Sequence, residues 1–281
     1  MKKLDRLDWA EGLRLSSFGV SAGVRVNVLG VLPHILPLLP PGWKRSRRVV
    51  VERLYSLVVG RDCQRAGMHP LHVLYADSTR VARGAALDQV LAALETDLHR
   101  HTAEAASDLS FLHAGVVGWR GRAIVFPGRS LSGKTTLVRE MLRLGATYYS
   151  DEFAVVDNSG LVHPFARPLG IREDSSYSQT KYAAERLGAV SGVKPLPMGV
   201  AVICKYQAGA RWQPVPLSQG QGALELLANS VAVRSKPDET LRRLQKLVRH
   251  SVFVQGTRGE AREAAASILN LSCAHKCPET A

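Results

Sequence analysis

The chain has 281 residues, of which 46% are hydrophobic and 22% are charged, with a mean hydropathy of -0.04. This balance is typical of a folded globular protein and excludes an intrinsically disordered chain. The formal net charge of +13 favours acidic partners such as nucleotides. Nucleic acid is not an expected partner, because no aromatic residues interleave the basic stretches and no helix-turn-helix or zinc-finger spacing occurs.

Residues 1–107 predict a small α+β region whose role the sequence does not reveal. A strand is expected at residues 18–28, a short helix at 32–39, and a hairpin sheet at 49–60 and 71–83. Residues 85–106 predict a long helix, because leucine and valine recur there at three- and four-residue steps. The most apolar run, residues 26–42, is interrupted by prolines and is too short to span a membrane. We therefore expect a cytoplasmic protein without membrane insertion.

Residues 108–270 predict a second region, and residues 271–281 a C-terminal tail. Residues 111–119 and 121–126 predict an antiparallel hairpin. A helix is expected after residue 133, with Leu137, Met141 and Leu144 on one face. Further strands are predicted at 146–152, 153–157, 199–207 and 251–256, helices at 223–233 and 238–250, and a mobile loop or poorly packed helix at 175–194.

The segment from Gly128 to Thr135 fits the phosphate-binding pattern G-x-x-x-x-G-K-[ST]. Glycine at both ends allows consecutive backbone N–H groups to converge on a phosphate, and the following helix adds the positive end of its dipole. Lys134 can reach the outer phosphates, and the Thr135 hydroxyl can bind Mg²⁺. The expected nucleotide-binding residues are Gly128, Arg129, Ser130, Ser132, Gly133, Lys134, Thr135 and Thr136.

Two further features accompany the loop. Asp151 and Glu152 follow Lys134 by about one helix and one strand, which returns the chain to the loop if that strand neighbours the strand at 121–126. His113 lies at the start of the hairpin that leads to the loop. From spacing alone, a carboxylate pair at the end of a surface strand and a structural histidine remain alternatives.

Residues 111–172 resemble the C-terminal catalytic domain of HPr kinase/phosphorylase, a bacterial serine kinase related in fold to PEP carboxykinases. The matching stretches are LHAGVV, GRSLSGKTT, YYSDE and the RPLGIRE of residues 167–173. The resemblance implies an α/β (α+β overall) fold: a P-loop catalytic domain with a mixed sheet, preceded by the smaller α+β region. Within this resemblance, the chain looks more like the shorter HPr-kinase-like proteins.

The resemblance also implies chemistry. The chain is expected to bind ATP and Mg²⁺ and to transfer the γ-phosphate to a Ser or Thr hydroxyl of a protein or peptide. Asp151 is then the base, with His113 near it tuning the charge and Lys134 on the phosphates, while Thr135 and Glu152 help to hold the metal. Members of the family commonly form multimers, so a homo-oligomer is also expected.

Two other readings of the motif stay open. A P-loop ATPase or nucleotide-dependent switch has the same loop but releases phosphate to water. A non-catalytic module for nucleotides or acidic partners needs neither Asp151 nor Lys134 for its function.

Overall fold

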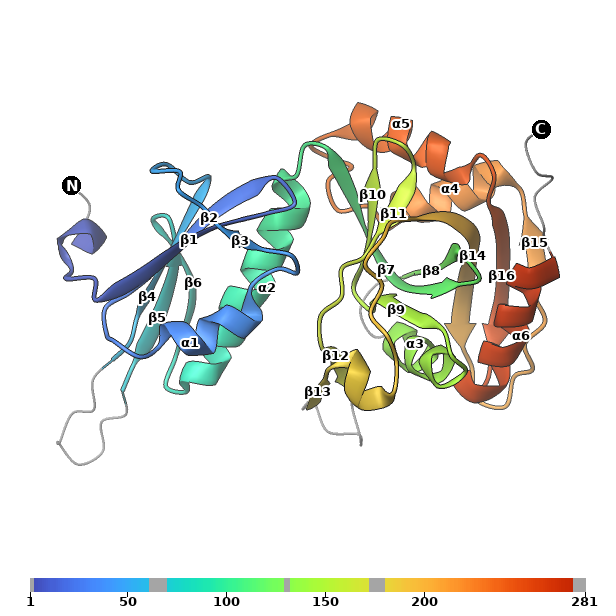
Figure 1. Ribbon diagram of the computed structural model, residues 1–281, viewed down its shortest axis with the longest axis horizontal. Coiled ribbons are helices and arrows are strands. Elements are labelled where there is room, and N and C mark those ends of the chain that lie inside the picture. Colours follow the sequence, from blue (N-terminus) through green and yellow to red (C-terminus); the bar gives the residue numbers. More distant parts are fainter. Residues whose placement is uncertain (1–2, 61–69, 129–131, 172–179, 275–281) are drawn as a thin grey trace. The chain divides into compact units, whose positions relative to one another are not determined.

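The computed structural model describes residues 3–60, 70–128, 132–171 and 180–274 of the chain (Figure 1). The chain divides into two compact units, Met1–Ser107 (unit 1) and Asp108–Ala281 (unit 2). This division falls where the sequence predicts the end of the N-terminal region. Both units combine mixed sheets with helices, as the predicted α/β (α+β) class requires.

Unit 1 is built on a six-stranded sheet with the strand order β3-β1-β2-β4-β5-β6. Its strands are β1 (Glu11–Ser17), β2 (Val20–Val26), β3 (Lys44–Arg45), β4 (Arg53–Val58), β5 (His72–Ala76) and β6 (Thr79–Gly84). Neighbours are antiparallel except β2 and β4, which run parallel. The helical elements are η1 (Lys3–Arg6), α1 (Leu32–Ile35), η2 (Leu36–Leu38) and α2 (Leu87–Ala105).

The core of unit 1 lies between the sheet and α2. Alternate residues of the strands, such as Leu13 and Leu15 on β1, belong to the same buried cluster as Leu94 and Leu98 of α2. The helix predicted at residues 85–106 is therefore confirmed, together with its apolar face. The strand predicted at 18–28 begins only at Val20, because Phe18 and Gly19 form the turn between β1 and β2.

Unit 2 contains an eight-stranded mixed sheet with the main order β11-β10-β7-β8-β14-β16-β15, and β9 pairs with β7. The strands are β7 (Leu109–Trp119), β8 (Arg122–Pro127), β9 (Thr147–Ser150), β10 (Phe153–Asp157), β11 (Leu161–His163), β14 (Leu196–Tyr206), β15 (Val215–Leu217) and β16 (Val252–Arg258). β12 (Leu169–Ile171) and β13 (Thr180–Tyr182) form a separate two-stranded sheet. The helical elements are α3 (Lys134–Arg143), η3 (Ala184–Leu187), α4 (Gln219–Ala228), α5 (Pro237–Val248) and α6 (Ala261–Ala274).

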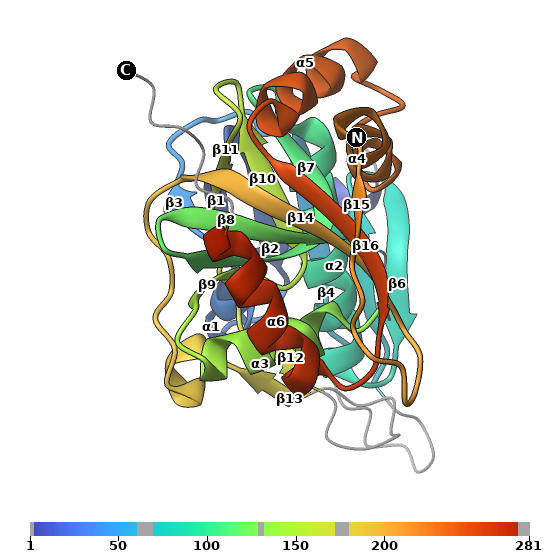
Figure 2. The ribbon, with the colours of Figure 1, turned by 90° about the vertical axis from the view of Figure 1, so that its right-hand side faces the viewer.

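Helices cover both faces of the unit 2 sheet (Figures 1 and 2). α3 and α6 pack on one face, against Ile124 and Phe126 of β8, while α4 and α5 pack on the other, against Ala123 and Val125. The alternation along β8 reflects the two-residue period of a strand that is buried on both faces. β8, β14 and β16 run parallel, so their C-terminal ends lie at one edge of the sheet, where the predicted phosphate-binding loop begins.

Several sequence-based expectations need correction. β1, β15 and α6 were not predicted, and α6 extends through residues 271–274 of the expected tail. Leu144 follows the end of α3 and is exposed, whereas Leu137 and Met141 are fully buried as predicted. Residues 175–179 of the expected mobile loop lie outside the described residues, and the rest of that region includes β13 and η3.

Candidate functional site

The predicted P-loop has the structural context that its motif requires. β8 ends at Pro127, Gly128 follows, and α3 begins at Lys134 directly after Gly133. Gly133 has a φ of 80°, in the left-handed region that favours glycine. Arg129 and Ser130, which are also expected nucleotide-binding residues, lie outside the described residues. A strand thus leads into the loop and a helix leaves it, with the helix N-terminus at the loop.

Lys134 lies across the two ends of the loop. Its Nζ donates a hydrogen bond to the carbonyl of Gly128 at 2.6 Å and lies 3.5 Å from Ser132 Oγ. Burial lowers the pKa of Lys134, whereas the nearby Asp151 and Glu152 raise it. The ammonium group therefore lies between Gly128 and the first turn of α3, and a helix N-terminus favours an anion.

Asp151 follows β9 and contacts the start of α3. Its Oδ2 accepts a hydrogen bond from Thr135 Oγ1 at 3.2 Å, and its Oδ1 accepts one from the Tyr148 hydroxyl at 3.0 Å. β9 pairs with β7 and not with β8, so the expected strand neighbour is wrong, yet the turn after β9 still brings the carboxylate to the loop. Burial raises the pKa of Asp151, and the charge of Arg167 opposes that rise.

Glu152 has a different partner. It forms an ion pair with Arg167, whose side chain is mostly buried. The Tyr148 hydroxyl also donates to the Arg167 carbonyl at 2.8 Å, and because it carries one hydrogen it serves this acceptor and Asp151 alternately. The Gly170 N–H donates to Asp151. Residues 167–171 of the RPLGIRE stretch therefore lie against the acid pair, while residues 172 and 173 fall outside the described residues.

His113 lies on β7 between the loop and the acid pair. Its carbonyl accepts a hydrogen bond from the Gly128 N–H at 3.0 Å, and its ring lies 5.1 Å from the ring of Phe153 on the neighbouring strand β10. A Cβ on Gly115, two residues further along β7, would lie 3.5 Å from Lys134 Cβ. Since alternate strand residues share a face, the exposed His113 side chain belongs to the face of β7 that meets α3.

The oxygen atoms at the start of α3 suit a hard divalent cation. Magnesium prefers oxygen ligands and is usually bound by one or two carboxylates together with substrate phosphates and water. The Thr135 hydroxyl and the Asp151 carboxylate provide such oxygen ligands and are hydrogen-bonded to each other. Glu152, the expected metal ligand, instead forms an ion pair with Arg167. Among the described residues, no three His, Cys, Asp or Glu side chains form a metal-binding group.

Sequence reasoning missed two groups that contact this site. Tyr148 precedes Asp151 by three residues within YYSDE, and its hydroxyl bonds that carboxylate. Arg258, at the end of β16, donates to the carbonyl of Gly133 at 3.1 Å. Tyr148 could have been found from the sequence, because it belongs to the YYSDE motif. Arg258 could not, because it lies 125 residues after Gly133 and no sequence motif links the two.

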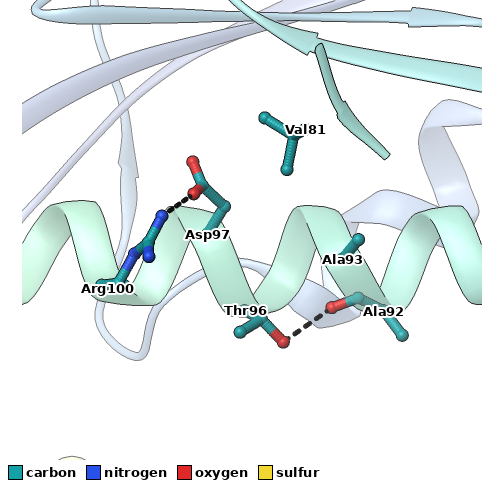
Figure 3. Close-up of a pocket in the computed structure, with 6 residues that line it drawn as sticks. All are labelled: Val81, Ala92, Ala93, Thr96, Asp97 and Arg100. Atoms are coloured by element: carbon teal, nitrogen blue, oxygen red, sulfur yellow. Dashed lines mark hydrogen bonds and ion pairs between the residues drawn. The ribbon is translucent and has the colours of Figure 1, made fainter. Parts of the chain in front are cut away.

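Unit 1 contains an open pocket of about 380 Å³ between β6 and α2 (Figure 3). It is lined by Val81, Ala92, Ala93, Thr96, Asp97 and Arg100. The Asp97 carboxylate accepts hydrogen bonds from Arg100, from Arg53 and from the Tyr55 hydroxyl. These bonds tie α2 to β4, which is a structural role, and none of the expected site residues lies in this pocket.

Comparison with known proteins does not assign a family. No family model matches the chain, and no curated protein matches it significantly. In the described part of the chain, no helix is both long and apolar enough to cross a bilayer. The geometry of the loop and the acid pair is therefore the basis for any functional conclusion.

Proposed function

We propose that the chain is an ATP-dependent phosphotransferase of the HPr-kinase type, which transfers the γ-phosphate to a Ser or Thr hydroxyl of a protein or peptide. The observation that carries this proposal is the hydrogen bond between Thr135 and Asp151 at the N-terminus of α3. Phosphoryl transfer requires a phosphate cradle, a metal site and a carboxylate that orients the acceptor, all in one place. The order of hairpin, loop, helix, YYSDE and RPLGI supports a catalytic domain of the HPr kinase/PEP carboxykinase type.

The loop residues bind the phosphates in this proposal. The N–H groups of the first turn of α3 and the helix dipole stabilise negative charge at Gly133 and Thr135. Lys134 needs only a rotamer change to exchange the Gly128 carbonyl for a phosphate oxygen, because its ammonium group already lies in the loop. Thr135 and Asp151 would hold Mg²⁺, which would neutralise charge on the phosphates when it is bound.

Asp151 is the residue we assign to the acceptor. Its Oδ2 already accepts a hydrogen bond from one hydroxyl, that of Thr135, so it can accept one from an incoming Ser or Thr. It takes the proton as the acceptor oxygen attacks the γ-phosphorus, and ADP leaves on the opposite side. Positioning and charge stabilisation supply most of the acceleration in such a transfer. His113 pairs with Phe153, which directly follows the acid pair, so its position supports a role next to Asp151.

The test combines acceptor labelling with nucleotide binding. Purified full-length protein is incubated with γ-³²P-ATP, Mg²⁺ and lysate of its source cell, and labelled Ser and Thr residues are identified by mass spectrometry. D151N should abolish labelling but keep the affinity for ATP measured without Mg²⁺ within about threefold, because the loop still binds the phosphates while the reacting hydroxyl loses its base. K134A should weaken both, and D108N, which changes an exposed carboxylate, should alter neither.

The outcomes separate the three readings. If D151N labels acceptors as fully as the wild type does, the assignment of Asp151 as the base is contradicted. Release of phosphate without a labelled acceptor would favour an ATPase or a switch. A protein that binds no ATP would contradict the proposal altogether.

A further inference from the structure

Arg258 is a buried cation at the base of the P-loop. It is the last residue of β16, and only 2% of its surface is exposed. Its guanidinium donates to two backbone carbonyls, that of Gly133 at 3.1 Å and that of Gly259 at 3.0 Å. Among the described residues, Nε has no hydrogen-bond partner, and no carboxylate lies within ion-pair distance of the guanidinium.

The guanidinium packs directly against the loop. A Cβ added to Gly133 would clash with a terminal nitrogen of Arg258, and the positive φ of this residue also disfavours a side chain. The Gly133 carbonyl also accepts the N–H of Leu137, and it is therefore the first carbonyl of α3. By holding this carbonyl, Arg258 fixes the orientation of the peptide group that directly precedes Lys134.

The charge of Arg258 has no protein counter-charge in the described structure. Burial of an unpaired charge is costly, and the charge acts strongly where water is excluded. The guanidinium also contacts the Cys204 thiol, and its central carbon lies 5.4 Å from the centre of the Tyr206 ring. Neither group supplies a negative charge to the guanidinium near neutral pH, because the Tyr206 contact is made through the ring and burial raises the pKa of the Cys204 thiol. A phosphate group at the N-terminus of α3 would provide the missing negative charge.

We propose that Arg258 is a positioning residue for the nucleotide phosphates, which holds the Gly133 carbonyl in place and contributes positive charge beneath the loop. This inference rests on the phosphate binding of the proposed function but not on the transfer step. A purely structural role would have a different consequence: removal of the guanidinium would then destabilise the ligand-free protein.

The experiment compares R258M, R258K and R243M in the full-length chain. Arg243 is also buried, but it lies on α5, on the other face of the sheet, and donates hydrogen bonds to Asn158 and Ser110.

Isothermal titration measures the affinity for ADP and for inorganic tripolyphosphate. We expect R258M to weaken both by about tenfold or more, which corresponds to one strong charge-assisted hydrogen bond. R258K should fall between R258M and wild type, because Lys keeps the charge but loses the planar fork. R243M should bind within about twofold of wild type.

A purely structural role of Arg258 would affect the stability of the ligand-free protein, and urea unfolding measures this stability. Replacement of an uncompensated buried charge by an apolar side chain is often neutral or stabilising. The ligand-free R258M protein should therefore have an unchanged or higher urea midpoint, while tripolyphosphate stabilises it less than it stabilises wild type.

Each result decides the inference. Wild-type affinity of R258M for ADP and tripolyphosphate would overturn it, and so would a lower ligand-free midpoint with an unchanged gain from tripolyphosphate. If R258M does not fold, R258K decides: weaker tripolyphosphate binding at a normal midpoint supports the inference, and unchanged binding overturns it. A wild-type protein that binds neither ligand would instead contradict the proposed function.

Discussion

Tyr148 and Tyr149 are adjacent on β9, and their hydroxyl groups lie on opposite faces of the strand. The Tyr148 hydroxyl bonds Asp151 and the Arg167 carbonyl, whereas the Tyr149 hydroxyl donates to the carbonyl of Lys194 at 2.7 Å. Both substitutions to Phe remove one buried hydrogen bond and should cost about 1 kcal/mol of unfolding free energy. Only Y148F should slow acceptor phosphorylation, by roughly tenfold, because only Tyr148 orients the Asp151 carboxylate.

Urea unfolding and initial rates of acceptor labelling measure these two effects. Y149F serves as the matched control, since it loses a hydroxyl from the same strand without a contact to the acid pair. Equal labelling rates for the two variants would show that Tyr148 has no influence on the reaction.

At the scale of single residues, the sequence predicted much of this site but not how its side chains pair. The proximity of Asp151 to the glycine-containing loop could be predicted because the motif and the length of one helix plus one strand constrain it. The partners of Glu152 and Arg258 could not be predicted, because each pairing depends on how the chain returns to the loop. Arg243 is buried, although it lies in a stretch of the sequence that is rich in basic residues.

At the scale of elements, the turn between β10 and β11 contains a pH-dependent anchor. Asp157 Oδ1 accepts the N–H groups of Ser159 and Leu161, and Oδ2 lies 2.7 Å from His163 Nε2. Burial alone would raise the pKa of Asp157, but these hydrogen bonds outweigh it and lower the pKa. The ionised carboxylate therefore stabilises the fold above the unfolded pKa of about 3.9, and this contribution is lost as pH falls through the lower folded pKa.

We accordingly expect D157N to reduce the unfolding free energy by about 1 kcal/mol at pH 7. The difference from wild type should narrow as the pH falls below about 4, where wild type also loses the charge. Urea unfolding from pH 3 to pH 8 measures the difference, with D108N as an exposed control. A difference that stays constant over this range would assign the effect to packing and not to charge.

The elements that the sequence missed lack a strong hydrophobic pattern. β1 alternates charged and apolar residues within a stretch that looks like a charged terminus, and β15 is a three-residue strand with a central proline. α6 buries Ala261, Ala264, Ala265, Ile268 and Leu269 at helical spacing, but alanine gives a weak periodic signal. In contrast, α2 and α3 bury large aliphatic residues at helical spacing, and their helices were predicted.

At the scale of the whole molecule, each unit has its own core. The core of unit 1 consists of residues from its six-stranded sheet and α2, and unit 2 has two clusters, one on each face of its sheet. The sequence predicted the boundary because the long helix ends where a new hairpin begins. It did not predict the order of the strands, which depends on pairings distant in sequence, such as β7 with β9.

All described groups of the candidate site belong to unit 2, so we expect residues 108–281 to fold and to bind nucleotide on their own. His113, the loop, Asp151 and Arg258 are held by β7, β8, α3 and β16, and both faces of this sheet are covered by helices of the same unit. Circular dichroism and urea unfolding test the fold of the fragment, and titration with ADP tests the site, with K134A in the fragment as control. We expect the affinity to lie within about threefold of that of the full chain, because the phosphate contacts stay local. If the fragment folds cooperatively but does not bind ADP as the full chain does, residues of unit 1 are needed for binding. Acceptor phosphorylation should then be measured with the full chain.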